Sequence, residues 1–347
     1  MKEIIIAGAG LSGLTAAINL AKAGRKVVVH EQGPGSGIKY GGDFQGLENW
    51  SSKTDVLEQV RNWGINPSFP YVPFCETFYY DYQLNKYQVK WSKPMFYLVK
   101  RGSSEKTIDS AVLKQAKDLG VEVKYNSRVN PEEADIVATG GKGAKVAVVG
   151  GVFETNLPNQ SHSILDDEIA PAGYAYFLVM NGEATIATCF AGPIPENAYA
   201  KTVEKFEKIL KIKVPVDAKR FGGTLGFRLS MPNDNKIHVG ESAGFQDYLW
   251  GFGMRFAMES GYLAAKSILE GISYKKLVKK LIAPRLKATF IDRYLYEKMG
   301  NTGYKLALKK YASSDLLSEK LRNLYGVYTM KHRLFYLSAK FKHRNVA

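Results

Sequence analysis

The chain has 347 residues, of which 45% are hydrophobic and 23% are charged, and its net charge is +15. This composition is typical of a folded globular protein and excludes a disordered chain. The two cysteines, Cys75 and Cys189, are too far apart in sequence to predict a disulfide framework or a metal-ligand spacing. A reducing, cytoplasmic compartment without a metal site is therefore expected.

The N-terminus predicts a strand at 4–7, a helix that ends near Ala23 and a second strand at 26–30. A turn between the first strand and the helix explains the glycines there, whereas a signal peptide would leave them unexplained. Elsewhere the chain has no apolar run of about eighteen residues, so no membrane-spanning helix is expected.

A glycine motif joins the first strand to the first helix. Gly8, Gly10 and Gly13 match the pattern G-x-G-x-x-G. The first glycine permits a tight turn, the second lets the backbone approach a pyrophosphate, and the third lets the helix pack against the strand. Glu31 ends the second strand and can accept hydrogen bonds from both ribose hydroxyls, which favours a free 2′-hydroxyl. These elements predict a dinucleotide-binding unit, with FAD and NAD both open.

A second segment, 236–267, favours FAD. A short apolar run leads into Gly240 and Glu241, and an acid in this position can bind a ribityl hydroxyl. The glycine-containing stretch 251–253 then precedes a helix that begins near Met254. Backbone N–H groups and a helix N-terminus would face the flavin edge where charge accumulates on reduction.

Several motifs carry a family resemblance. The chain has G-E-S-A-G-F at 240–245, G-F-G-M at 251–254, S-G at 260–261 and A-A at 264–265. These stretches resemble FAD-dependent oxidoreductases of the p-hydroxybenzoate-hydroxylase fold, most closely the geranylgeranyl reductase family. Residues 96–123 are similar to the family's strand, arginine and helix, which places Arg101 at its cofactor-contacting arginine, and 169–188 resembles a strand of the reductases. The resemblance extends from Met1 to about Leu269.

The chain also departs from the family pattern. Glu241 stands where the family has Asp, and Tyr248 stands where it has Pro. Gly140 and Gly141 replace the Asp-Gly pair that is associated with NAD(P)H-using hydroxylases, which argues against a hydroxylase. Thr139 and Gly140 instead resemble the strand end of two-dinucleotide flavoproteins.

The loop after Glu31 contains Tyr40, Gly41 and Gly42. In the reductase family a cysteine near the flavin precedes the glycine pair, and alignment on the glycines puts Tyr40 at that cysteine. A thiol step there is excluded, so Tyr40 is either a stacking wall or proton donor beside the flavin, or a loop residue that shields the cofactor. Three acids near the expected flavin loops are interpreted as turn or cap residues: Asp43, Glu48 and Asp247.

Aromatic residues are dense between Trp63 and Tyr97, and part of this stretch alternates as in an antiparallel strand pair. In the related fold, this segment and residues 151–220 build a sheet that covers the flavin. The aromatic residues are expected to line an apolar tunnel for a prenyl chain or quinone, or to form ordinary sheet core.

The C-terminal segment 301–347 is basic, with ten Lys or Arg against two acids and apolar residues in between. Such a segment suits an anionic membrane surface on the inner face of the membrane, or a solvated helical face packed on the body. Nucleic acid is the least favoured partner because no nucleic-acid-binding motif accompanies the charge.

The sequence predicts an α/β fold with a Rossmann-like FAD-binding domain, an antiparallel-sheet substrate domain and a helical C-terminal region. The FAD-binding domain is expected at 1–62, 98–150 and 221–285, the substrate domain at 63–97 and 151–220, and the basic helical region at 286–347. The residues expected to bind FAD are Gly8, Gly10, Ser12, Gly13, Glu31, Gln32, Gly41, Gly42, Arg101, Val129, Thr139, Gly140, Gly240, Glu241, Gly251, Phe252, Gly253 and Met254, and the candidate catalytic residue is Tyr40.

The resemblance implies an FAD-dependent oxidoreductase of lipid metabolism, in which reduced flavin transfers hydride to C=C bonds of an isoprenoid or similar apolar substrate. A flavin monooxygenase or quinone-linked dehydrogenase on the same fold stays open, as does a non-redox protein that binds lipid. No second complete glycine motif follows a clear strand, so the sequence identifies no electron donor.

Overall fold

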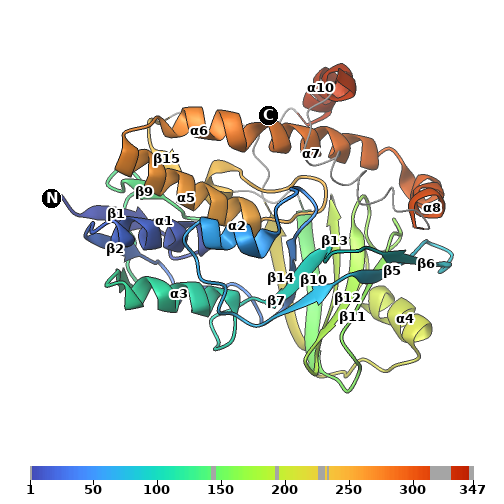
Figure 1. The fold of residues 1–347 in the computed structure, drawn as a ribbon. Helices are drawn as coiled ribbons and strands as arrows, with labels where there is room; N and C mark the ends of the chain where they lie inside the picture. The colour runs from blue at the N-terminus through green and yellow to red at the C-terminus, as the bar shows by residue number, and fades with distance from the viewer. Residues whose placement is uncertain are drawn as a thin grey trace.

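The computed structural model describes residues 2–141, 146–191, 195–225, 231–232, 234–312 and 330–343. Three sheets and the helices around them make up this part of the chain. Figure 1 shows the first sheet with its helices at one end of the molecule and the large second sheet at the other.

The first sheet is parallel, with the strand order β15-β9-β1-β2-β8. Its strands are β1 (Ile4–Ala7), β2 (Val27–His30), β8 (Glu122–Lys124), β9 (Ile136–Val137) and β15 (Ile237–His238). Parallel strands need crossover connections, so segments far apart in the sequence meet in this sheet. Helix α1 (Leu11–Lys22) packs on β1, and α3 (Ile108–Asp118) and α5 (Met254–Glu270) pack on α1.

The second sheet has seven strands in the order β14-β10-β13-β12-β11-β5-β6, and every neighbouring pair except β11 and β5 is antiparallel. The strands are β5 (Glu76–Tyr80), β6 (Lys86–Lys90), β10 (Val146–Glu154), β11 (Gln160–Ile164), β12 (Tyr174–Met180), β13 (Glu183–Ala191) and β14 (Lys219–Leu225).

The two faces of the second sheet have different neighbours because side chains alternate along each strand. On one face, Phe177 of β12 packs with Phe206 of α4 (Ala198–Leu210). On the opposite face, Tyr174, Tyr176 and Leu178 of the same strand belong to a separate apolar cluster. This second cluster faces the rest of the protein.

A third, antiparallel sheet lies beside the large one and contains β3 (Phe44–Glu48), β7 (Phe96–Lys100) and β4 (Tyr71–Phe74). The backbone N–H of Phe44 donates a hydrogen bond of 2.9 Å to Oγ1 of Thr185 on β13, which joins the two sheets. Helix α2 (Val56–Asn62) follows β3 and is capped by Asp55, whose side chain accepts from the N–H of Leu57 at 2.9 Å.

Helices dominate the described part of the C-terminal region: α6 (Tyr274–Leu281), α7 (Ala283–Tyr296), α8 (Gly300–Tyr311) and α10 (Met330–Lys342). Helix α10 packs against α7 (Figure 1). In the ranges that the structure describes, no helix is both long and apolar enough to span a bilayer. The predicted basic segment 301–347 lies outside the described residues at 313–329 and 344–347.

The predicted fold class is confirmed, and β1 and the start of α5 match the expected strand and helix start. The domain boundaries expected at 97/98, 150/151 and 220/221 fall within β7, β10 and β14. These three strands therefore continue from the segments assigned to FAD binding into those assigned to the substrate sheet.

Candidate functional site

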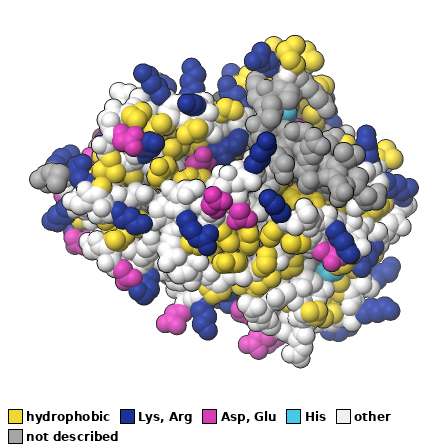
Figure 2. All heavy atoms as spheres, in the orientation of Figure 1, with side chains coloured by type: hydrophobic (Ala, Val, Ile, Leu, Met, Phe, Trp, Pro, Cys, Tyr) yellow, Lys and Arg dark blue, Asp and Glu magenta, His cyan; other side chains and the backbone are white. Residues whose placement is uncertain are grey.

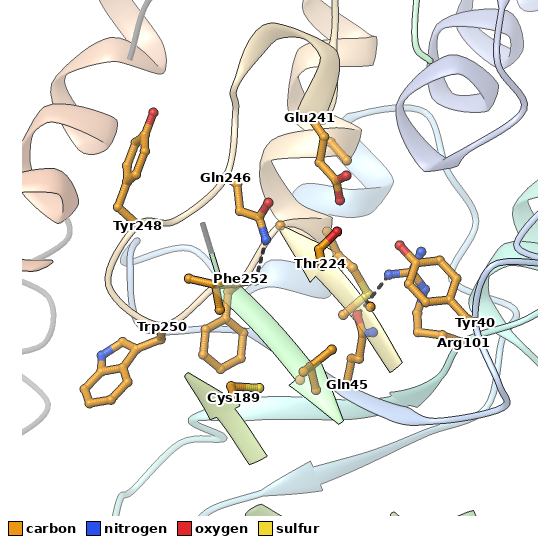
Figure 3. Close-up of a pocket in the computed structure, with 18 of the residues that line it drawn as sticks. Tyr40, Gln45, Arg101, Cys189, Thr224, Glu241, Gln246, Tyr248, Trp250 and Phe252 are labelled. Carbon is orange, nitrogen blue, oxygen red and sulfur yellow. Dashed lines mark hydrogen bonds between the residues drawn. The ribbon is translucent and has the colours of Figure 1, made fainter. Parts of the chain in front are cut away.

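A cavity of about 1630 Å³ is lined by residues from both the first and the second sheet. Ligand pockets usually occupy about 300–1,000 Å³, so this cavity has room for a cofactor and a second molecule. Figure 3 shows Tyr40 and Arg101 on one side of it, and Phe252 and Trp250 on the other. Of the predicted cofactor-binding residues, all line the cavity except Gly13, Gly41, Gly42 and Gly240.

The turn between β1 and α1 forms a cradle at the edge of the cavity. Gly8 has a φ of +107°, a conformation that L side chains rarely adopt. A Cβ on Gly13 would overlap the carbonyl oxygen of Gly8, whereas a Cβ on Gly10 would have no heavy atom within 4 Å. Gly13 thus permits helix-to-turn packing, and Gly10 leaves open space in front of the helix N-terminus, where a pyrophosphate fits.

Glu31 follows the last residue of β2, next to this cradle. One carboxylate oxygen accepts a hydrogen bond from the N–H of Ala9 at 2.9 Å, and the other accepts from the N–H of Gly33 at 2.8 Å. Each oxygen keeps a further lone pair for a ribose hydroxyl. Gln32 and Val129 also line this end of the cavity.

Tyr40 lies beside Arg101 on the wall of the cavity. The Arg101 guanidinium carbon is 3.8 Å from the centroid of the Tyr40 ring. Arg101 donates from Nε and Nη2 to the two carboxylate oxygens of Asp109 at 2.8 and 2.9 Å, and from Nη1 to Oε1 of Gln45 at 3.0 Å. Burial alone would lower the pKa of Arg101, but the charge and hydrogen bonds of the Asp109 carboxylate, with further contributions from Tyr40 and Asp43, together raise that pKa.

Gly41 and Gly42, the pair after Tyr40, are each explained by the local backbone conformation or packing. Gly42 has a φ of +93°, which favours glycine, and a Cβ on Gly41 would lie 2.9 Å from Cβ of Phe221 on β14. The loop therefore packs closely on the second sheet. Asp43, which follows the pair, accepts from the N–H of Gly41 at 3.2 Å and from Nε2 of Gln45 at 2.8 Å.

The loop before α5 is held from several sides. Asp247 accepts from the N–H groups of Leu249 and Trp250 at 3.0 and 2.8 Å, so it is a turn residue, as expected. Gln246 donates from Nε2 to the carbonyl oxygen of Gly251 at 3.0 Å. Among the described residues, Oε1 of this glutamine is buried without a hydrogen-bond partner, which leaves an acceptor at the cavity for a ligand. The helix N-terminus at Gly253 faces the same space.

Glu241 lies in the 3-10 helix η1 (Gly240–Ala243) and lines the cavity (Figure 3). Its carboxylate is 3.5 Å from Nζ of Lys39 and accepts from the N–H of Gly141 at 3.4 Å. Thr139 and Gly140 line the cavity next to it. Glu48 accepts from the N–H groups of Trp50 and Ser51 at 3.2 and 3.1 Å, so it is a turn residue, as expected. It also accepts from Nη1 of the buried Arg255 at 3.2 Å.

The part of the cavity under the second sheet is an aromatic chamber. Within the aromatic stretch between Trp63 and Tyr97, Tyr79 and Phe96 line the chamber, whereas Phe69 and Tyr80 are buried in the core. Aromatic residues of this stretch therefore lie both on the cavity wall and in the core. Cys189 of β13 also lines the chamber, below Phe252 in Figure 3.

The chamber keeps its weak acids protonated. Burial raises the pKa of Tyr79 to about 12. Burial, with a smaller effect from the Asp43 charge, raises the pKa of the Cys189 thiol to about 12. The pKa values of Tyr174 and Tyr176 are raised well above their usual value, again chiefly by burial. The chamber thus presents neutral, largely apolar groups.

Sequence analysis missed Asp109 and Gln45, which hold Arg101, and Cys189, which faces the chamber. Asp109 lies in the first turn of α3, where an acid also suits the helix dipole, so its sequence context did not distinguish it. The position of Cys189 depends on strand register, and no local pattern reveals it.

Comparison with known proteins supports a flavin site. A family model described as an FAD binding domain matches residues 3–41, which contain β1, α1 and β2. A digeranylgeranylglycerophospholipid reductase of Methanococcus vannielii is 22% identical, with 90% of this chain and 88% of that protein covered. The cofactor that these matches indicate is FAD, and over most of its length the chain is similar to a geranylgeranyl reductase at low identity.

Solved flavoproteins share the fold. A geranylgeranyl bacteriochlorophyll reductase-like protein of Thermoplasma acidophilum superimposes with a TM-score of 0.69 at 15% identity, covering 99% of both chains. A flavin-dependent brominase has a TM-score of 0.65 at 14% identity, covering 99% of this chain and 100% of its own. The cradle at Gly10, the Glu31 carboxylate and the free acceptor of Gln246 fit FAD in this cavity.

Proposed function

We propose that this oxidoreductase reduces C=C bonds of an isoprenoid or similarly apolar lipid. The observation that carries the proposal is that one cavity joins the dinucleotide cradle to the aromatic chamber. An apolar chain in the chamber would reach the loop 251–253, beside which the flavin is expected to lie. The similarity to a reductase of geranylgeranyl lipids supports this substrate class.

Bound FAD, once reduced, would supply the hydride for such a reduction. The protein's own residues would bind the chain and exclude water: Tyr174, Leu178 and Trp250 line the chamber with aromatic and aliphatic surface. Completion of the addition needs a proton, and the Cys189 thiol and the Tyr79 phenol hold one at physiological pH because their pKa values are about 12. An external reductant must then return two electrons for each bond reduced.

The test is anaerobic mixing of the chemically reduced holoenzyme with geranylgeraniol. The expected result is recovery of the oxidised flavin absorbance together with a product that has gained two hydrogens for each reduced bond. Unchanged substrate in this anaerobic test, together with NAD(P)H-dependent oxygen uptake and a hydroxylated product in a separate aerobic assay, would overturn the reductase and support a monooxygenase on the same fold.

A further inference from the structure

Helix α10 carries two sets of residues with the same spacing of four, three and four positions. One set, here called the inner stripe, is His332, Tyr336, Ala339 and His343. The other set, here called the outer stripe, is Met330, Leu334, Leu337 and Phe341. With about 3.6 residues per turn, these two stripes lie on opposite sides of the helix.

The inner stripe fixes α10 on α7. Ala339 has no exposed surface. Nε2 of His332 lies 3.4 Å from a carboxylate oxygen of Asp292, and Nε2 of His343 lies 3.2 Å from one of Glu297. Nζ of Lys342 adds a 2.7 Å contact to Glu297. The helix is therefore held with a defined face outward.

The outer stripe is apolar and exposed. The exposed fractions are 74% for Met330, 77% for Leu334, 75% for Leu337 and 78% for Phe341. Single exposed hydrophobic residues are common, but four at this exposure along one helix face mark an interaction surface. Figure 2 shows apolar side chains at this edge of the molecule, where Figure 1 places α10.

The same region holds almost all of the net charge. Residues 273–347 contain 18 Lys or Arg and four Asp or Glu, a net charge of +14 out of +15 for the chain. The exposed lysines of α6 are Lys275, Lys276, Lys279 and Lys280, and Arg333 and Lys340 are exposed on α10. The two described acids of this region, Asp292 and Glu297, are engaged with the inner stripe. The surface around the outer stripe is therefore strongly cationic.

We propose that α10 docks the protein on an anionic lipid bilayer. An apolar helix stripe with basic residues beside it suits the boundary between headgroups and acyl chains, where the stripe is buried and the cations meet lipid phosphates. A second copy of the chain fits less well because two such cationic faces repel each other. Nucleic acid would match the charge but leave Leu334 and Leu337 exposed. The inference is independent of the proposed reduction, since it uses α10 and the charge distribution alone.

The test is co-sedimentation of the full-length, FAD-loaded protein with vesicles. Phosphatidylcholine vesicles containing phosphatidylserine are expected to bind the protein, pure phosphatidylcholine vesicles to bind it weakly, and salt to weaken binding. The double variant Leu334→Gln/Leu337→Gln is expected to lower the partition coefficient at least about tenfold. The matched control is Val216→Gln, because Val216 is fully exposed between α4 and β14. The charge variant Lys279→Glu/Lys280→Glu is expected to lose the preference for phosphatidylserine.

Flavin content and thermal midpoint should be unchanged in all variants, since the substituted side chains are exposed. Wild-type protein that does not bind phosphatidylserine vesicles would overturn the proposal, as would equal binding by the stripe variant and the Val216→Gln control. A dimer in sedimentation velocity that the stripe variant dissociates would assign the stripe to a second copy. Duplex DNA binding that the stripe variant abolishes would assign it to nucleic acid. Either result overturns bilayer docking.

Discussion

The phenol of Tyr174 donates a hydrogen bond of 2.8 Å to the carbonyl oxygen of Trp250. Tyr174 belongs to β12 in the second sheet, and Trp250 immediately precedes the loop 251–253 that leads into α5. The Trp250 ring also meets the rings of Tyr174 and Tyr296 edge-on, with centroids 5.5 and 4.9 Å apart. This contact links the aromatic chamber directly to the loop that is expected to meet the flavin.

Replacing Tyr174 with Phe tests that link. The variant is expected to lose about 1 kcal/mol of unfolding free energy and to bind FAD severalfold more weakly, because the loop loses a buried hydrogen bond. The measurements are chemical denaturation and titration of the apoprotein with FAD. Tyr176→Phe, on the same face of β12, is the control and should keep the FAD affinity. Equal affinities in the two variants would show that the hydrogen bond does not position the loop.

Two glycines of the cradle should respond differently to substitution. Gly10→Glu is expected to fold but to purify without flavin, because its side chain occupies the open space before α1. Gly13→Ala is expected to lose about 1–3 kcal/mol of stability, since the added Cβ overlaps Gly8. Flavin absorbance and denaturation curves of both variants check these outcomes. A Gly10→Glu protein with full flavin content would place the cofactor elsewhere.

Tyr40 is expected to act through its ring. Since the ring stacks on Arg101, Tyr40→Phe should keep turnover within about twofold, whereas Tyr40→Ala should lower stability by about 1 kcal/mol and weaken FAD binding. Turnover, flavin titration and thermal unfolding separate the two variants. A loss of about hundredfold in Tyr40→Phe turnover would instead identify the hydroxyl as a general acid.

The α8 side of the cavity offers a test of substrate binding. Ala307 lines the cavity, so Ala307→Phe is expected to raise KM for a geranylgeranyl substrate by about tenfold or more through lost space, with FAD content unchanged. Thr302→Phe places the same ring on an exposed position of the same helix and should leave KM unchanged. Equal KM values for both variants would show that the substrate does not extend to α8.

The parts of the site that the sequence predicted depend on local structure. The strand at 4–7, the glycine turn and Glu31 lie within one continuous stretch, and each residue type there has a backbone or hydrogen-bonding reason. The helix start at Met254 could be predicted for the same reason, because glycines precede a run of helix-forming residues. The structure has these elements where the sequence predicted them.

The site residues that the sequence analysis missed depend on pairing between segments that are distant in the chain. Gln45 reaches Arg101 because β3 pairs with β7, and Phe221 meets Gly41 because β14 lies beside the loop. Whether a β residue faces the core or the chamber changes with a register shift of one position, which no single sequence pattern specifies for Cys189. The sequence therefore indicated aromatic strands but not which aromatic residues line the cavity.

The buried His162 is expected to make stability depend on pH. It is 3% exposed on β11, and burial, aided by the positive charge of Lys86, lowers its pKa from 6.5 to about 4. Between these values the unfolded chain binds a proton that the folded chain does not. The contribution of His162 to the unfolding free energy is therefore fully present above pH 6.5 and is lost as the pH drops towards about 4. The loss over this interval should be about 3 kcal/mol.

In His162→Gln the contribution of residue 162 to the pH dependence of the unfolding free energy should disappear. The variant also loses the contacts of the imidazole with Tyr80 and Gln160 at 3.2 and 2.7 Å. Urea denaturation of both proteins across the interval gives the difference in unfolding free energy at each pH. The two curves are expected to converge as the pH falls, because only the wild-type protein loses unfolding free energy by keeping the imidazole neutral. Parallel curves would show that His162 is protonated in the folded protein.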